Sequence, residues 1–215
     1  MASSVFVAAC GGLILGLCWP RVGIYFRQRY PTKQMMPQVP WRPWEPVAGM
    51  VMGILLWVWR PEHISAGAVF WFAMVALLAA RIDLFCGVLP YRFSIGMAVV
   101  GWGVQWESGY ITESILVGMA TAVLMSFIVW ISRGGMGGGD IWFAAGIATW
   151  FSAMEAWTFL CIAFISGAIY GIGYYLYHGC RRGLALPFGP FLAIAGIIVV
   201  WLGEQMSEYC EIFIG

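Results

Sequence analysis

Two carboxylates and a glycine run are the residues of this sequence whose types and spacing could do chemistry. The chain carries only two aspartates, Asp83 and Asp140, and each lies at one end of an apolar segment. The stretch 134–139 contains five glycines and Met136, and Asp140 follows it directly. Because glycine loses the most backbone freedom on ordering, we expect this run to be a loop and not a helix interior. Asp140 would then begin the next helix.

Two carboxylates that lie close together cannot both ionise cheaply, so such a pair shares one proton and one pKa rises. An aspartic protease uses this arrangement: one carboxylate takes a proton from water, and the other donates a proton to the peptide carbonyl. The glycine run would let an extended substrate lie against the backbone beside Asp140. Structural roles stay open for each residue alone. Asp140 could simply cap a helix, and Asp83 could pair with Arg81, Arg92 or Arg133.

The composition places these carboxylates in a membrane protein. Hydrophobic residues make up 62% of the chain and charged residues only 10%, against roughly one quarter in soluble domains. Four stretches approach the roughly 20-residue length of a membrane-spanning helix, namely 64–82, 115–131, 157–177 and 184–202. We therefore expect an all-α polytopic membrane protein. Because no basic residue precedes Cys10, we expect the first apolar segment to be a membrane helix and not a cleaved signal peptide.

The charge distribution predicts about eight crossings with the N-terminus outside. The apolar segments lie near 4–19, 47–59, 64–82, 93–106, 111–131, 141–154, 157–177 and 184–202. If every segment crosses, ten of the eleven basic residues fall on one side, in the connections 20–46, 81–92, 132–140 and 178–183. Only Arg60 falls on the other side. Because basic loops stay in the cytoplasm, both aspartates are expected at the cytoplasmic face.

We expect residues 1–215 to form a single membrane-embedded domain, in which 20–46 is a short basic cytoplasmic loop. The tryptophans and arginines of this proline-rich loop suit the headgroup region of the bilayer. The six cysteines of the chain form no CxxC pair and show no metal-ligand spacing. Neither a zinc site nor a disulfide framework is therefore expected.

An ordered set of motifs resembles the type IV prepilin peptidases, which are membrane aspartic peptidases of the Gly-x-Gly-Asp type. Asp83 with Leu89-Pro90 resembles their Asp-x5-Leu-Pro motif, and the stretch 135–140 resembles their Gly-x-Gly-Asp motif with its preceding Gly-Met. The stretch 42–45 is similar to their Arg-Tyr-Pro-Leu-x-Glu sequence, and 186–192 is similar to their C-terminal Pro-Phe-Gly-Pro-x-Leu. The resemblance covers most of the chain.

This resemblance implies a leader peptidase with Asp83 and Asp140 as the catalytic pair and with neither a metal nor an organic cofactor. It implies substrates that are prepilin-like or pseudopilin-like proteins, with a basic leader, a glycine before the cut and then a hydrophobic helix. The implied location is the bacterial plasma membrane, with the bilayer and the substrate as partners and no nucleic acid. The residues implied to bind substrate or shape the site are Glu45, Pro90, Gly137, Gly138, Gly139, Pro187, Phe188, Gly189 and Pro190. Helix electrostatics would explain Glu45 equally well.

The chain departs from the family pattern at three places. Tyr91 follows Pro90 where the family has aspartate, and Trp142 stands where the family has lysine. The loop 20–46 lacks the two CxxC pairs that bind zinc in bifunctional members, so we do not expect their N-methyltransferase activity. None of these changes removes an aspartate.

Two other functions remain open from the sequence. An ion-coupled transporter could use Asp83 and Asp140 as a relay, although both lie at one face and no inverted repeat is visible. A catalytically inactive relative that acts as a pilus or secretion assembly factor would fit Tyr91 and Trp142. The motif set favours the peptidase.

Overall fold

The structure, a computed structural model, describes residues 65–132, 136–178 and 187–214. These residues form helices and contain no strand, so the predicted all-α class is confirmed for this part of the chain. The predicted segments 4–19 and 47–59 and the loop 20–46 lie outside it. The helices are α3 (Ala66–Cys86), α4 (Tyr91–Glu107), α5 (Ile111–Ile131), α6 (Gly138–Ala148), α7 (Ala153–His178) and α8 (Gly189–Ile214).

Three of these helices are long and apolar enough to cross a membrane. Their apolar spans are Gly67–Leu84 in α3, Ile111–Ile131 in α5 and Ala153–Tyr177 in α7. The predicted last segment, 184–202, differs from the structure at both ends. Its helix α8 begins only at Gly189, because Pro187 and Phe188 precede it in non-helical conformation, and its shorter apolar part is Gly189–Leu202.

The connection between α3 and α4 is short and sharply defined. Helix α3 continues to Cys86, so Asp83 lies in its last turn. Gly87 then adopts the left-handed conformation, with φ of 63°, and donates its N–H to the carbonyl oxygen of Asp83 at 2.7 Å. Glycine carries no Cβ penalty there and is the usual residue for this helix ending. Pro90 precedes the first residue of α4 with φ of −67°, an angle that its ring imposes.

The glycine run differs from the expectation drawn from its composition. Gly138 and Gly139 belong to the first turn of α6, so the helix begins two residues before Asp140. The backbone N–H of Gly137 donates to Oδ2 of Asp140 at 3.2 Å, and this side chain therefore helps to satisfy the free N–H groups before the helix. The predicted loop is confirmed only up to Gly137 among the described residues.

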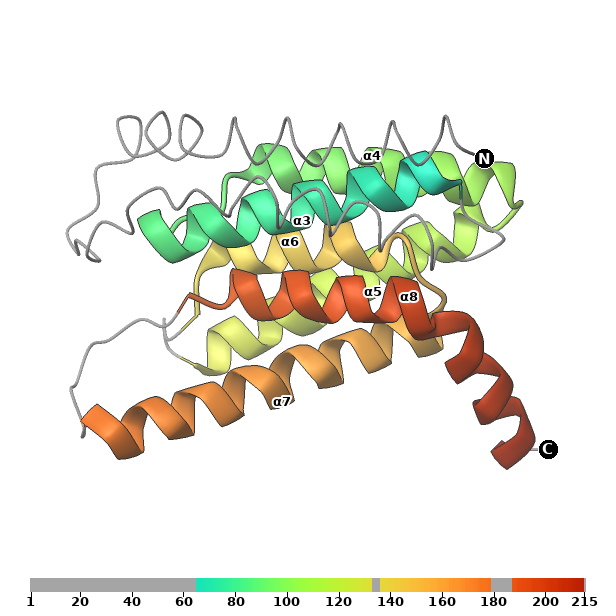
Figure 1. Ribbon diagram of the computed structural model, residues 1–215. Coiled ribbons are helices and arrows are strands. Elements are labelled where there is room, and N and C mark those ends of the chain that lie inside the picture. The colour runs from blue at the N-terminus through green and yellow to red at the C-terminus, as the bar shows by residue number, and fades with distance from the viewer. Residues whose placement is uncertain (1–64, 133–135, 179–186, 215) are drawn as a thin grey trace, which may run out of the picture.

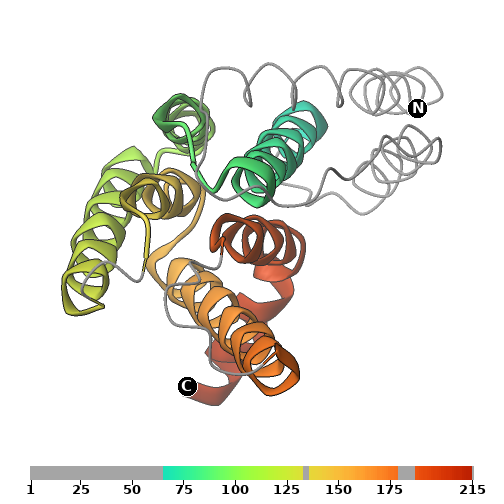
Figure 2. The same cartoon turned by 90° about the vertical axis from the view of Figure 1, so that its left-hand side faces the viewer.

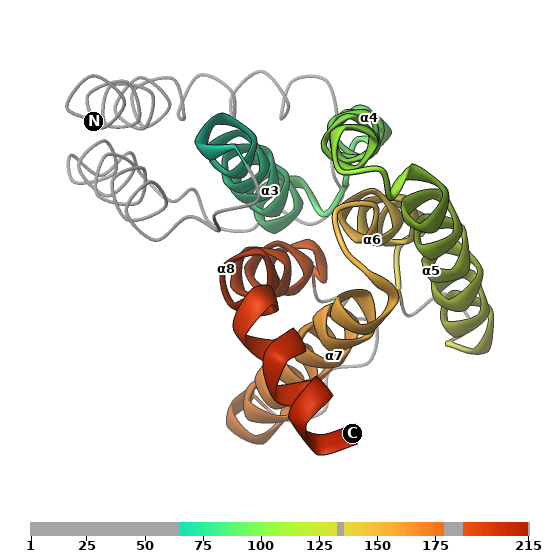
Figure 3. The same ribbon diagram turned by 90° about the vertical axis from the view of Figure 1, so that its right-hand side faces the viewer.

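Helix α6 is short and lies at the centre of the described bundle. It packs against α4 and α5 on one side and contacts α8 on the other, while α8 packs against α3 and α7. The two end-on views show the same arrangement (Figures 2 and 3). Figure 1 shows that α3 ends where α4, α6 and α8 begin, at one end of the bundle. The functional motifs therefore gather at this end.

Glycines let the helices around α6 approach closely. A Cβ atom built on Gly146 of α6 would lie 2.6 Å from the carbonyl oxygen of Ser94 of α4. A Cβ atom built on Gly118 of α5 would lie 2.9 Å from Cγ2 of Thr149. Small residues at such crossings are typical of membrane helices, because the backbones can then pack directly.

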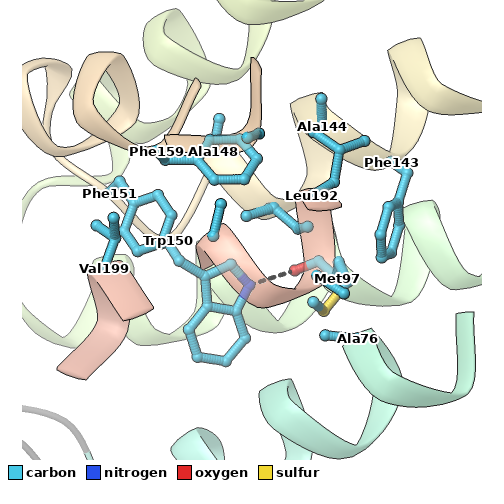
Figure 4. Packing of buried hydrophobic residues seen from close by; sticks show 14 of the residues in the cluster. Ala76, Met97, Phe143, Ala144, Ala148, Trp150, Phe151, Phe159, Leu192 and Val199 are labelled. Carbon is cyan, nitrogen blue, oxygen red and sulfur yellow. Dashed lines mark hydrogen bonds between the residues drawn. The ribbon is translucent and has the colours of Figure 1, made fainter. Parts of the chain in front are cut away.

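The core below this crossing is built around Trp150, which is 2% exposed and follows α6. Its indole N–H donates to the carbonyl oxygen of Met97 of α4 at 2.9 Å (Figure 4). The ring of Phe72 from α3 meets Trp150 edge-on, with 5.0 Å between centroids. Through these contacts α3 and α4 both pack against the residue that follows α6, and the position of α6 relative to both helices is fixed.

Candidate active site

Both aspartates lie at the same end of the bundle and are buried. Asp83 occupies the last turn of α3 and Asp140 the first turn of α6, and each is 5% exposed. They interact electrostatically, because the negative charge of Asp83 acts on the carboxyl group of Asp140. The structure thus brings together the two carboxylates that the sequence singled out, although they are far apart in the chain.

Asp83 receives a hydrogen bond from the beginning of α8. The backbone N–H of Gly189 donates to Oδ2 of Asp83 at 2.8 Å in a buried environment. A hydrogen bond to a charged group contributes about 1.5–3 kcal/mol. This bond orients the carboxyl group and connects the Pro187–Pro190 motif directly to the first aspartate.

Leu89 lies at the meeting point of three motifs. A Cβ atom built on Gly139 would lie 2.9 Å from the carbonyl oxygen of Leu89 and 3.0 Å from its Cβ. A Cβ atom built on Gly189 would lie 3.0 Å from Cδ1 of Leu89 and 2.8 Å from Oδ2 of Asp83. The absence of a side chain at Gly139 and Gly189 therefore permits the packing that assembles the site. Gly138 is different, because a Cβ atom there would meet nothing within 4 Å.

The pKa of Asp140 is raised from 3.8 to about 7, mainly by burial and secondarily by the negative charge of Asp83. The N–H of Gly137, which donates to the Asp140 carboxylate, acts in the opposite direction. Asp140 lies outside the three helices that are long and apolar enough to cross a membrane. Near neutral pH it can hold a proton beside a second carboxyl group, and the pair can therefore both donate and accept a proton.

The remaining predicted site residues surround this pair to different degrees. Pro90 is buried at the start of α4, and Pro187, Phe188 and Pro190 are half-buried around the beginning of α8. Gly137 and Gly138 are exposed. Glu45 lies outside the described residues.

Sequence reasoning missed two contact residues. Leu89 was noted only as part of a motif, and its packing against two glycines could not be read from spacing. Gly167 of α7 is the second of these residues, because a Cβ atom built on it would lie 2.9 Å from Cε2 of Phe188. Phe188 also packs on Phe164 at 5.1 Å between centroids. Helix α7 thus supports the residue that precedes Gly189.

The chain is similar in sequence to known leader peptidases. The sequence model described as the type IV leader peptidase family matches residues 70–172. A prepilin leader peptidase/N-methyltransferase of Dichelobacter nodosus is 33% identical over 155 residues, which cover 69% of this chain and 52% of the relative. Its counterpart from Legionella pneumophila is 28% identical over 135 residues, covering 60% of this chain and 47% of the relative.

The chain spans about half the length of these curated relatives. It covers more of a shorter one, the leader peptidase HopD of Escherichia coli, with 27% identity over 142 residues, 60% of this chain and 89% of the relative. No solved structure gives a significant match. The matched residues 70–172 contain both aspartates and the glycine run 134–139. In these residues, the chain resembles the type IV leader peptidase family.

Proposed function

We propose that this protein is a membrane aspartic endopeptidase that removes the leader of type IV prepilin-like proteins. The observation that carries the proposal is the buried pair of Asp83 and Asp140, in which one charge acts on the other and the N–H of Gly189 orients Asp83. The names of the relatives support the substrate class.

In the proposed mechanism the two carboxyl groups share one proton. The ionised carboxylate of Asp83 accepts a proton from a water molecule, whose oxygen attacks the scissile carbonyl carbon. The protonated Asp140 donates its proton to the carbonyl oxygen, which yields a tetrahedral diol. When the C–N bond breaks, the nitrogen takes up the proton held by Asp83, and one diol hydroxyl returns its proton to Asp140. The reaction needs neither a metal nor an organic cofactor.

The site-shaping residues act around this pair in the proposal. Gly139 and Gly189 keep the backbone close to Leu89 and Asp83, and Gly137 and Gly138 leave room for an extended substrate beside Asp140. Helices α4 and α8 begin beside these glycines. Their first residues and the residues just before them fix where each helix begins, and these residues are Pro90, Pro187, Phe188 and Pro190. Glu45 is proposed to meet the basic leader.

We further propose that the whole chain is one domain that crosses the bacterial plasma membrane eight times, with the N-terminus outside. The site then opens to the cytoplasm, on the side of ten of the eleven basic residues. The basic leader would stay on this side, the cut would follow a glycine, and the apolar helix beyond it would remain in the bilayer.

The test is cleavage of a co-expressed substrate with a basic leader that ends in glycine. Asp83→Asn and Asp140→Asn are each expected to lower the rate by about 10²–10⁴-fold, because each removes a proton donor or acceptor. Glu107→Gln, an exposed carboxylate at the end of α4, is the matched control. Normal cleavage by either aspartate variant would disprove the pair mechanism. An inactive wild type would favour an assembly factor.

A further inference from the structure

A groove of about 510 Å³ lies between α4, α5 and α6. Its rim consists of exposed large apolar side chains, among them Tyr91, Ile95, Val99, Met119 and Trp142. The volume is in the range of ligand-binding pockets, roughly 300–1,000 Å³. The lining contains no charged residue, so an occupant must be apolar where it touches the groove.

The deeper part of the lining is made of small residues from all three helices. Ser94, Gly118 and Gly146 are buried, and Ala98, Ala122 and Ala145 are half-buried, behind the exposed rim. Small residues flanked by large apolar ones allow another helix to approach closely in a membrane. The shape therefore suits a helix whose side chains enter between the rim residues.

One polar group in this lining points to a partner. Ser94 is 5% exposed, and its hydroxyl has no hydrogen-bond partner in the part of the chain that the structure describes. A buried hydroxyl without a partner costs about 1–3 kcal/mol. Serine hydroxyls commonly bond across helix contacts in membranes. An occupant that brings an acceptor would satisfy Ser94.

The groove begins near the candidate active site, although neither aspartate lines it. Tyr91 directly follows Pro90, and Trp142 lies two residues after Asp140. From Tyr91 the lining follows α4 as far as Trp102, a rise of about 16 Å at 1.5 Å per residue. A chain whose scissile bond lies at Asp83 and Asp140 can therefore continue into this groove over about three helical turns.

We propose that the groove between α4, α5 and α6 docks the apolar helix that follows the scissile bond in the substrate. This inference rests on the proposed peptidase function and assigns the place where its substrate is held. Tyr91 and Trp142 would contact the first residues after the cut. The hydroxyl of Ser94 would donate a hydrogen bond to a small polar side chain or to a backbone carbonyl oxygen that a glycine of the helix exposes. The groove would then select substrates by the apolar helix and leave the basic leader to the opposite side of the site.

The first experiment measures contact and does not depend on cleavage. A photo-reactive phenylalanine analogue is placed at Met119, in the groove, or at Leu116, on the same helix outside it, in the full-length Asp140→Asn protein. The two side chains are equally exposed, at 60% and 61%. A model substrate with a basic leader, a glycine and an apolar helix should crosslink at Met119 and not at Leu116. Equal crosslinking at both positions, or capture of lipid without substrate at Met119, would overturn the proposal.

The second experiment separates docking from chemistry. Ala122→Phe fills the groove, whereas Val123→Phe changes the neighbouring, 71% exposed residue, which does not line it. Ala122→Phe should raise KM for the helix-bearing substrate by about tenfold or more, as expected when apolar contacts in a pocket are lost. Its cleavage of a short peptide with the same leader and no apolar helix should stay unchanged, which also shows that the variant is folded.

The two proposals fail in different ways. If the wild type cleaves neither substrate, the peptidase function is wrong. Crosslinking at Met119 then still shows whether the groove binds the apolar helix. If the wild type cleaves both substrates and Ala122→Phe matches Val123→Phe on each, the groove does not dock the helix and the peptidase function stands.

Discussion

The backbone N–H of Gly189 donates a hydrogen bond to Oδ2 of Asp83 at 2.8 Å, across 106 positions of sequence. The first residue of α8 therefore orients the carboxyl group in the last turn of α3. Because α8 also packs along α3, the bond is held by the helix contact around it and not by local chain geometry. A disturbance at the beginning of α8 should consequently act on Asp83.

Gly189→Ala should impair cleavage. The added Cβ would lie 2.8 Å from Oδ2 of Asp83 and 3.0 Å from Cδ1 of Leu89, so the carboxyl group or α8 must move. Loss of a hydrogen bond to a charged group predicts a decrease of about ten- to a hundredfold in the initial rate of leader removal. Gly103→Ala on α4 is the control, because a Cβ there meets nothing within 4 Å. Equal rates for the two variants would show that the Gly189 contact is unimportant.

The two glycines before Asp140 should respond differently to alanine. At Gly139 the new Cβ would lie 2.9 Å from the carbonyl oxygen of Leu89, whereas at Gly138 it would meet open space. Gly139→Ala should therefore reduce both cleavage and the yield of folded protein. Gly138→Ala should keep the fold and can even stabilise the first turn of α6, since alanine favours helix over glycine by about 1 kcal/mol. Thermal unfolding in detergent and the cleavage rate measure both effects, and the reverse order would contradict this packing.

Gly167 of α7 should affect cleavage through Phe188. Gly167→Ala places a Cβ 2.9 Å from the ring edge of Phe188, which must shift and carry the beginning of α8 with it. We expect a lower kcat with little change in KM. Shortening the ring in the double variant Gly167→Ala/Phe188→Leu should restore part of the rate. Gly173→Ala, at an open position on the same helix, is the matched control. A double variant that is slower than both single variants would exclude this steric route.

The pH dependence of cleavage should report the proton on Asp140. Burial and the charge of Asp83 raise the pKa of Asp140 from 3.8 to about 7, so the acid form is present below this pH and is lost above it. If Asp140 donates the proton to the peptide carbonyl, kcat should fall as the pH rises through about 7. Initial rates at saturating substrate in detergent solution measure this decline. A rate that stays constant well above pH 7 would require another proton donor.

Much of the site could be predicted because its signals are local or compositional. The two aspartates stand out because the chain has no others. A carboxyl group inside an apolar membrane protein is costly and is therefore usually functional or paired. The apolar stretches predicted α3, α5 and α7, because a helix satisfies its own backbone hydrogen bonds and its length follows from bilayer thickness. The last apolar stretch, 184–202, predicted α8 less well, because Pro187 and Phe188 are not helical and α8 begins only at Gly189.

Boundaries at glycines were harder to predict. Composition placed the run 134–139 in a loop, yet Gly138 and Gly139 form the first turn of α6. Intrinsic propensity disfavours glycine in a helix by only about 1 kcal/mol, and packing of Gly139 against Leu89 outweighs that cost. The same packing could not be inferred from spacing, because it joins residues that are 50 positions apart.

By itself, then, the sequence determined the helical membrane class, the two carboxylates and the motifs around them, since composition and hydrophobic length are properties of the chain alone. Only the tertiary structure decided that Gly189 orients Asp83, that Leu89 joins three motifs and that Tyr91 and Trp142 border one groove. These relationships depend on how α3, α4, α6 and α8 pack against one another. Such packing arises from steric fit between distant helices, which no local pattern of residues encodes.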